Sequence, residues 1–279
     1  MSVALAALSA AFYGVADFSG GLATRRAPVL RILLISQTAG AVLALAFVVT
    51  SGQRPPAIAD LSWGFVAGAC GVGGLALLYR GIAEGLVALV SPIAALVGAA
   101  IPVVFGMLAG EQPRGTALAG AALCIPAILL LSWERPNAGN RAAIRMSLFY
   151  GITSGVFIGA FFIALARTSP GSGLWPVLAA RVSSIPLVLA AALISRQRIS
   201  LVGPSTAPAV AAGLADMGAN ILFLLSARAG LLSIAALVTS LYPAPTVLLA
   251  RIVFRERVST IRALGMSLAI AGVALISLG

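Results

Sequence analysis

Histidine and lysine are both absent from the sequence, and each absence excludes classes of function. Without lysine the chain can form neither a P-loop nor a Schiff base, so direct coupling to ATP is not expected. Without histidine there is no Ser–His nucleophile pair, no HExxH zinc site and no imidazole proton shuttle. The two cysteines, Cys70 and Cys124, lie far apart within apolar segments, form no CxxC pair and are expected to be buried thiols. We therefore expect no cofactor, no metal and no catalytic residue.

Charged residues are also scarce, because they make up 9% of a chain of 279 residues in which 61% are hydrophobic. Apolar segments of about 20 residues follow one another, and a helix of that length crosses the roughly 30 Å of hydrocarbon in a bilayer. Backbone groups in lipid must pair within their own segment, so only helices fit. The sequence predicts an all-α membrane protein with ten transmembrane helices. They are expected at residues 3–23, 31–50, 61–83, 86–108, 115–133, 146–166, 174–195, 207–226, 231–253 and 262–278.

The formal net charge of +11 comes from arginines that stand mostly in the gaps between these segments. This placement argues against nucleic acid as a partner and for lipid bilayer around the chain. Most arginines follow the first, third, fifth, seventh and ninth segments, and arginine-rich loops stay in the cytoplasm. We therefore expect a multi-pass protein of a bacterial inner (plasma) membrane with both termini outside the cytoplasm. The oligomeric state is left open, with a monomer as one alternative.

The two halves of the sequence resemble each other at an offset of 145 residues, which places Gly68 on Gly213 and Glu111 on Glu256. The acidic match is the stronger signal, because acidic residues are few. A unit of five helices is odd in number, so its second copy must be inverted relative to the first. Inverted repeats around a central cavity are a recurring plan of transporters. The expected parts are a first five-helix repeat at 1–134, a linker loop at 135–145 and a second five-helix repeat at 146–279.

Short features in both halves resemble the ten-helix EamA type of the drug/metabolite transporter superfamily. They are the doubled unit, the steps Gly110-Glu111 and Arg255-Glu256 that close the fourth and ninth segments, and the glycines Gly120 and Gly265 that follow. The resemblance covers nearly the whole chain and implies a membrane transporter. Members similar to this chain often export amino acids and related metabolites. Many are described with cytoplasmic termini, contrary to the arginine placement.

The spacing from Pro176 to Arg181 is also similar to the pattern of the family's second helix. The first repeat departs from this pattern, because Leu33 stands five residues after Pro28. A role for such an arginine in both repeats is therefore not implied.

Three charged residues fall inside expected membrane helices: Asp17, Arg181 and Asp216. A central Asp or Arg costs about 2.5–3.5 kcal/mol on insertion scales, so such residues face the bundle interior or a wet cavity. They are candidates for substrate contact or proton coupling, and the alternative is that they pair with one another as internal links. Asn220 lies one helical turn from Asp216 and adds a polar neighbour.

The ninth expected helix carries polar residues and prolines at its centre, and the fourth has a weaker counterpart around Ser91. Prolines free backbone carbonyls, and paired interruptions in corresponding helices point to a binding site at the midplane. A simple kink is the alternative. With the aromatic candidates added, the proposed substrate-binding residues are Tyr13, Asp17, Tyr79, Ser91, Phe157, Arg181, Asp216, Asn220, Ser240 and Tyr242. For Tyr79 a place in the interfacial belt, and for Phe157 core packing, are the alternatives.

These observations favour a secondary transporter that moves small amphiphilic metabolites by alternating access, with aromatic or hydrophobic amino acids as first candidates and export as the expected direction. A lipid or drug carrier, or a flippase, of the same fold is an alternative, with Arg181 as its candidate headgroup site. A channel would show rings of similar residues, and none is visible. An intramembrane enzyme would need Asp17 and Asp216 to meet as a dyad. The solute, ion coupling and net direction stay open.

Overall fold

The computed structural model describes residues 1–84, 87–132, 141–196, 200–255 and 259–278, and these form helices without any strand. Within those ranges nine helical segments are long and apolar enough to cross a membrane, α9 and α10 counting as one, and α5 is a shorter apolar helix of 17 residues. The prediction of an all-α membrane protein is confirmed. The helices are α1 (Ser2–Thr24), α2 (Val29–Thr50), α3 (Ile58–Glu84), α4 (Val87–Leu108), α5 (Gly115–Leu131), α6 (Arg141–Ala166), α7 (Trp175–Ile194), α8 (Thr206–Ala229), α9 (Leu232–Thr239), α10 (Pro243–Phe254) and α11 (Thr260–Ser277).

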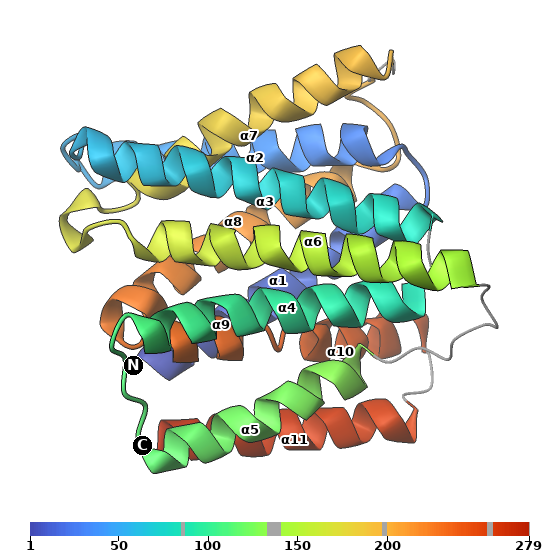
Figure 1. Ribbon diagram of the computed structural model, residues 1–279. Helices are drawn as coiled ribbons and strands as arrows, with labels where there is room; N and C mark the ends of the chain where they lie inside the picture. The colour runs from blue at the N-terminus through green and yellow to red at the C-terminus, as the bar shows by residue number, and fades with distance from the viewer. Residues whose placement is uncertain (85–86, 133–140, 197–199, 256–258, 279) are drawn as a thin grey trace.

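The bundle has two distinct ends (Figure 1). Both chain termini lie at one of them, which we call the terminus-bearing end. The α1–α2 turn with Arg25 and Arg26 and the start of α6 with Arg141 and Arg145 lie at the other, the arginine-rich end. Helices α1 and α6, which open the two halves of the chain, run in opposite directions, so the second half is inverted. Most of the expected linker lies outside the described residues, and α6 begins within it at Arg141.

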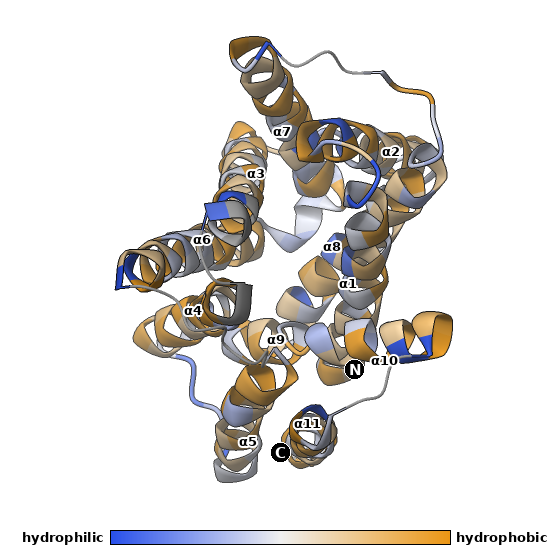
Figure 2. Ribbon diagram, turned by 90° about the vertical axis from the view of Figure 1, so that its right-hand side faces the viewer, coloured by the Kyte–Doolittle hydropathy of each residue, from blue (hydrophilic) through white to orange (hydrophobic). Residues whose placement is uncertain are grey.

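The two halves interleave rather than forming separate bundles (Figure 2). Helix α3 packs against α6 and α7, α1 and α2 pack against α8, and α5 pairs with α11. A Cβ atom on Gly68 of α3 would lie 2.0 Å from the carbonyl oxygen of Ala180 in α7. A Cβ on Gly213 of α8 would lie 2.1 Å from the carbonyl oxygen of Ser36 in α2. The two matched glycines therefore make matched close crossings, each against the second helix of the other repeat.

The ninth membrane segment is broken at its centre, as its prolines predict. Helix α9 ends at Thr239 and α10 begins at Pro243. Near the break, the Ser240 hydroxyl donates to the carbonyl of Ala236 at 2.8 Å, and the Thr246 hydroxyl donates to that of Tyr242 at 2.9 Å. Side chains thus engage carbonyls around the break, which is how irregular backbone is tolerated at membrane depth.

The fourth segment is not broken, so the predicted pair of interruptions is wrong for α4. That helix continues from Val87 to Leu108 through Pro92 and Pro102. Each of these widely spaced prolines removes a single backbone donor, and the hydrogen bonds between them hold the helix together. In the ninth segment Pro243 and Pro245 are two positions apart and follow directly on the break. The inverted halves therefore differ at this point.

Helix α8 lies at the centre of the bundle and buries Met217, Phe223 and Leu224 completely. These apolar side chains are packed by neighbours on several sides, including α1 and α2. The polar positions Asp216 and Asn220 lie on the same helix, so the packed core fixes their direction and depth.

Candidate functional site

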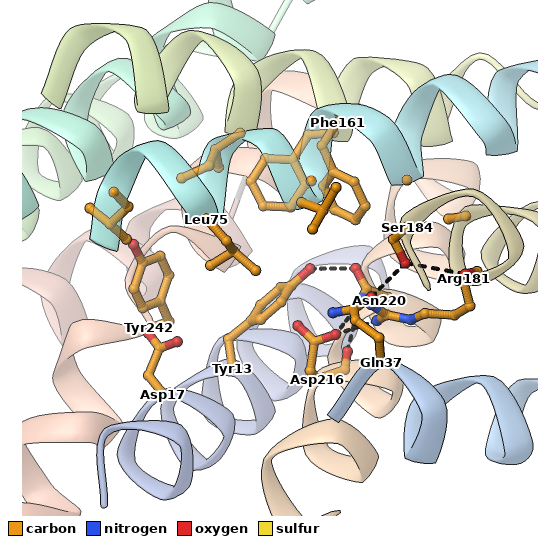
Figure 3. A pocket seen from close by; sticks show the side chains of 17 residues that line it. Tyr13, Asp17, Gln37, Leu75, Phe161, Arg181, Ser184, Asp216, Asn220 and Tyr242 are labelled. Carbon is orange, nitrogen blue, oxygen red and sulfur yellow. Dashed lines mark hydrogen bonds and ion pairs between the residues drawn. The ribbon is translucent and has the colours of Figure 1, made fainter. Parts of the chain in front are cut away.

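A cavity lies midway along the bundle and is lined by both halves of the chain. Helices α1, α2 and α3 contribute from the first half, and α6, α7, α8 and the break before α10 contribute from the second. Polar side chains form one wall, and aromatic and aliphatic side chains form the other (Figure 3). Such an arrangement, mostly apolar with a few placed polar groups, is typical of small-molecule sites.

Arg181 organises the polar wall. Its side chain lies near the start of α7 and is only 8% exposed. One terminal nitrogen donates to the Gln37 side-chain oxygen of α2, and the other forms an ion pair with the Asp216 carboxylate of α8. A guanidinium in a low-dielectric interior requires such partners, because its desolvation is otherwise uncompensated. Arg181 and Asp216 thus pair with each other, which was the alternative to a substrate role, and Gln37 joins this pair to α2 of the first half.

Asn220 extends the polar wall to α1. Its amide nitrogen donates to the Asp216 backbone carbonyl at 2.7 Å and to the Asp216 carboxylate at 3.1 Å. Its side-chain oxygen accepts the Tyr13 hydroxyl proton at 2.7 Å. At the other end of the network, the Ser184 hydroxyl donates to the Gln37 oxygen at 2.7 Å. A continuous chain of hydrogen bonds thus runs from α1 to α7 along one side of the cavity.

Asp17 lines the cavity but stands apart from this network. It follows Tyr13 by one helical turn on α1, and its side chain is exposed. No hydrogen bond or ion pair joins its carboxylate to any part of the chain that the structure describes. Figure 3 shows Asp17 near Tyr242, away from the Arg181 cluster.

The aromatic wall is formed by side chains from three helices and the α9–α10 break. The Tyr13 ring lies 6.3 Å from that of Phe162 in an edge-to-face arrangement, and 6.3 Å from that of Tyr242. Phe161 lines the cavity beside Phe162, with ring centroids 5.5 Å apart. Leu75 of α3 faces the same space. The break that ends α9 places Tyr242 in this wall, so the proline signal has a structural consequence at the site.

The structure brings most of the sequence-predicted site residues together. Tyr13, Asp17, Arg181, Asp216, Asn220 and Tyr242 all line the cavity. Three others lie outside its lining: Ser91 on α4, Phe157 on the outer part of α6 at 40% exposure, and Ser240, whose hydroxyl bonds within its own helix. The side chain of Tyr79 lies outside the described part of the structure.

Sequence reasoning missed two polar residues of the site. Gln37 is an amide in the middle of a mostly apolar helix. A polar side chain in such a helix is the feature that identified Asp216, so Gln37 could have been predicted from the sequence in the same way. Ser184 gives no such signal, because serines bond their own helix backbone at many membrane positions. The cluster of Phe161 and Phe162 was visible, but only the fold shows that these rings face the cavity while Phe157 does not.

The terminus-bearing end is linked by hydrogen bonds between the two halves. Glu111, in the turn after α4, accepts from the backbone nitrogens of Leu232 at 2.6 Å and Ser233 at 2.9 Å. These are the first residues of α9, where free N–H groups and the helix dipole favour an anion. The glutamate that stands out in the sequence repeat therefore caps a helix of the opposite half.

Two further links lie at the same end. Asp60, at the start of α3, accepts from the backbone nitrogen and from the hydroxyl of Ser169, both at 2.7 Å. The Gln53 side chain accepts from the Leu174 nitrogen at 2.9 Å, and its backbone carbonyl accepts from the Trp175 indole at 3.2 Å. Each link joins the first half to the α6–α7 connection or the start of α7 in the second.

Comparisons with known proteins agree with this architecture. The profile of the EamA-like transporter family matches residues 1–133 and again residues 145–278. A solved structure, described only as the crystal structure of a protein, superposes with a TM-score of 0.81 at 18% identity and covers 99% of this chain and 96% of that one. At that identity the likeness concerns the fold alone. The search of curated proteins found no match.

Proposed function

The chain belongs to the EamA-like transporter family, whose members are membrane transporters of small solutes, and we propose that it is a secondary transporter for small amphiphilic metabolites. The observation that carries this proposal is the cavity itself, which lies at mid-bundle and is lined by both inverted halves. Inverted-repeat carriers place their substrate there, because rocking of one half against the other then exposes it to each side in turn.

The two ends of the cavity support alternating access. Along α3 the lining runs from Gly68 to Leu78, over the half of the helix that leads to the arginine-rich end. On α1 it includes Tyr13, at the middle of the helix, and Asp17, one turn nearer that end, whereas on α6 and α7 it lies in the half nearer the terminus-bearing end. The opposite end carries the bonds of Glu111, Asp60 and Gln53. We propose that these bonds close the terminus-bearing side and that the cavity opens toward the arginine-rich side, which would be cytoplasmic in a bacterial inner membrane.

The chemistry of the walls suits amino acids with aromatic or hydrophobic side chains. The rings of Tyr13, Phe161 and Phe162 offer an apolar surface of the right size for an aromatic or aliphatic side chain. Asp17 offers a carboxylate to an ammonium group. An opening to the cytoplasm is the loading state of an exporter, and export is the direction that we propose.

Two alternatives, an intramembrane enzyme and a channel, receive less support. Asp216 is bound by Arg181 and Asn220, so it does not form a carboxylate dyad with Asp17 as an intramembrane aspartyl enzyme requires. A channel needs a continuous path, whereas hydrogen bonds between the halves cross the terminus-bearing end.

Counterflow in proteoliposomes tests the proposal. Purified protein is reconstituted with unlabelled phenylalanine or leucine inside, and uptake of the labelled amino acid is followed. A carrier gives a transient overshoot that saturates with concentration, and protein-free liposomes give none. Absence of counterflow for every amino acid tried would contradict the amino-acid proposal, and movement of fluorescent lipid between leaflets instead would assign the chain to lipid transport.

A further inference from the structure

Asp17 and Asp216 line the same cavity but differ in their bonding partners, and this difference indicates which solutes the cavity binds. Asp216 is satisfied by an ion pair with Arg181 and a hydrogen bond from Asn220. Asp17 is exposed within the lining and bonds to no group that the structure describes. An ionised carboxylate inside a membrane bundle is costly unless a cation or hydrogen-bond donor compensates it. The protein supplies that compensation for one aspartate and not for the other.

The charges that line the cavity do not balance. Arg181 carries the positive charge, and Asp17 and Asp216 carry the negative ones. Because Arg181 neutralises Asp216 directly, ionisation of Asp17 leaves a single uncompensated negative charge in the cavity. A cationic solute would balance it, a zwitterion would do so only with one of its ends, and an anion would add a second negative charge in a medium of low dielectric constant.

Side chains of the polar wall already donate hydrogen bonds within the protein. Both terminal nitrogens of Arg181 bond to Gln37 and Asp216, and the Asn220 amide bonds to Asp216. The Tyr13 hydroxyl donates to Asn220. The remaining guanidinium nitrogen, Nε of Arg181, is buried and faces α2, where a Cβ on Gly40 would lie 3.3 Å from it. Nε makes no hydrogen bond in the described structure, but its burial against α2 keeps it away from a solute in the cavity.

Aromatic rings flank the unpaired carboxylate. Tyr13 lies one helical turn before Asp17 on α1, and its ring lies 6.3 Å from that of Tyr242. Figure 3 shows Tyr242 on the Asp17 side of the cavity. The faces of aromatic rings attract cations, most strongly where water is excluded. A carboxylate beside two tyrosines is therefore a favourable place for an ammonium group.

We infer that Asp17 recognises the ammonium group of the solute, and that the preferred cargo is an amphiphilic organic amine with an aromatic or aliphatic body and no free carboxylate. The inference rests on the proposed transport function and narrows its substrate class. An amine binds more tightly than the amino acid of the same skeleton, and the amino acid binds more tightly than the corresponding acid without nitrogen. The apolar body packs against Phe161, Phe162 and Leu75.

Three probes of one skeleton test the inference: phenethylamine, phenylalanine and 3-phenylpropanoate. Their binding to the purified protein in detergent is measured by isothermal titration calorimetry, which avoids passive permeation of the amine. We expect phenethylamine to bind at least about tenfold more tightly than 3-phenylpropanoate, since a charge-assisted bond distinguishes them. In Asp17→Asn that ratio should fall toward one, and in Asp17→Glu it should persist.

A matched control separates the local effect from the loss of one negative charge. Glu84 is exposed beyond the membrane-spanning part of α3, so Glu84→Gln should leave the amine-to-acid ratio unchanged. Thermal unfolding of each variant confirms that it is folded. Equal binding of the three probes, tighter binding of 3-phenylpropanoate, no binding of the amine, or an unchanged ratio in Asp17→Asn would overturn the inference. Failure of the transport proposal is seen separately, as absence of counterflow in proteoliposomes.

Discussion

The two ends of the bundle are built from the same five-helix unit in opposite orientations, yet they differ in how the halves are joined. At the terminus-bearing end, Glu111 caps α9, Asp60 holds Ser169, and Gln53 binds the start of α7. At the arginine-rich end, the described residues show the Tyr150 hydroxyl donating to Glu84 at 2.8 Å, with Glu84 itself paired to Arg80 at 2.8 Å. The first set and the Tyr150–Glu84 bond are partly buried, whereas the Arg80–Glu84 pair lies in contact with solvent.

The difference between the ends is consistent with the proposed alternating access. Identical ends would leave the cavity equally open or closed on both sides, so one end must hold its links while the other releases them. Glu111 caps α9 at the terminus-bearing end, and its sequence counterpart Glu256 lies outside the described residues. Between the two ends, the Arg181 cluster ties α2 to α7 and α8. We therefore expect substitutions to have their largest effect in this middle cluster, less at the linked end and least at the arginine-rich end.

Removal of Arg181 should have the largest effect. Arg181→Ala leaves the Asp216 carboxylate without its counter-ion in a cavity wall, and breaking such a pair costs about 3–5 kcal/mol. Thermal unfolding in detergent should show a much lower midpoint, and counterflow should be lost. The control is Ser184→Ala, which removes one neutral hydrogen bond and costs about 1 kcal/mol. Equal midpoints for the two variants would show that the cluster is not the common support of both ends.

Removal of the Glu111 carboxylate should have an intermediate effect that is confined to one end. Glu111→Ala leaves the first two N–H groups of α9 without acceptors and removes an anion from a helix N-terminus, at a cost of about 1–3 kcal/mol. Closure at the terminus-bearing end should weaken by that amount. Limited labelling of Ser233→Cys by a water-soluble maleimide should become faster in the Glu111→Ala background. An unchanged labelling rate would contradict a role for Glu111 in holding this end.

The smallest effect is expected for Glu84, and it should depend on pH. Hydrogen bonds from Arg80 and then Tyr150 hold the pKa of the Glu84 carboxyl below its ordinary value of 4.5. A depressed folded pKa stabilises the fold above the unfolded value and loses that contribution as the pH falls through the folded one. The unfolding midpoints of Glu84→Gln and wild type should therefore differ by a constant amount at pH 6–8 and converge only below about pH 4.5. Convergence at neutral pH would contradict this assignment.

Much of the fold could be predicted from the sequence, because lipid imposes strong constraints on composition. Long apolar segments set the number of helices, and an odd repeat unit required inversion. The break before Tyr242 was predictable from adjacent prolines, whereas the same reasoning failed at Pro92 and Pro102, since single prolines are absorbed by a helix packed on its neighbours. Asp17, Arg181 and Asp216 could be chosen as site candidates because they are charged. A charged side chain within a membrane helix is costly, so it is usually there for function or for pairing with another charge.

The site could be predicted only in part, because a sequence does not show which way a helix faces. Phe157 and Phe161 are one turn apart and both pack on α3, yet only Phe161 lines the cavity, since Phe157 lies one turn nearer the start of α6, beyond the lining. Ser91 was chosen for its proline neighbour, but α4 lies behind α6 rather than at the cavity. Gln37 was overlooked although it is the amide that orients Arg181. Gln37 and Tyr13 bond to partners in the other half of the chain, which no local pattern reveals.

The most direct test of the account is the side from which the cavity can be reached. Leu75→Cys, made with Cys70→Ser and Cys124→Ala, places one thiol on the cavity wall, and an impermeant maleimide is applied to membrane vesicles of each orientation. Without solute, labelling should come from the arginine-rich side, and a transported solute should increase labelling from the terminus-bearing side. Equal labelling from both sides at all times, or labelling only from the terminus-bearing side, would contradict a carrier whose closed end is the one that Glu111 holds.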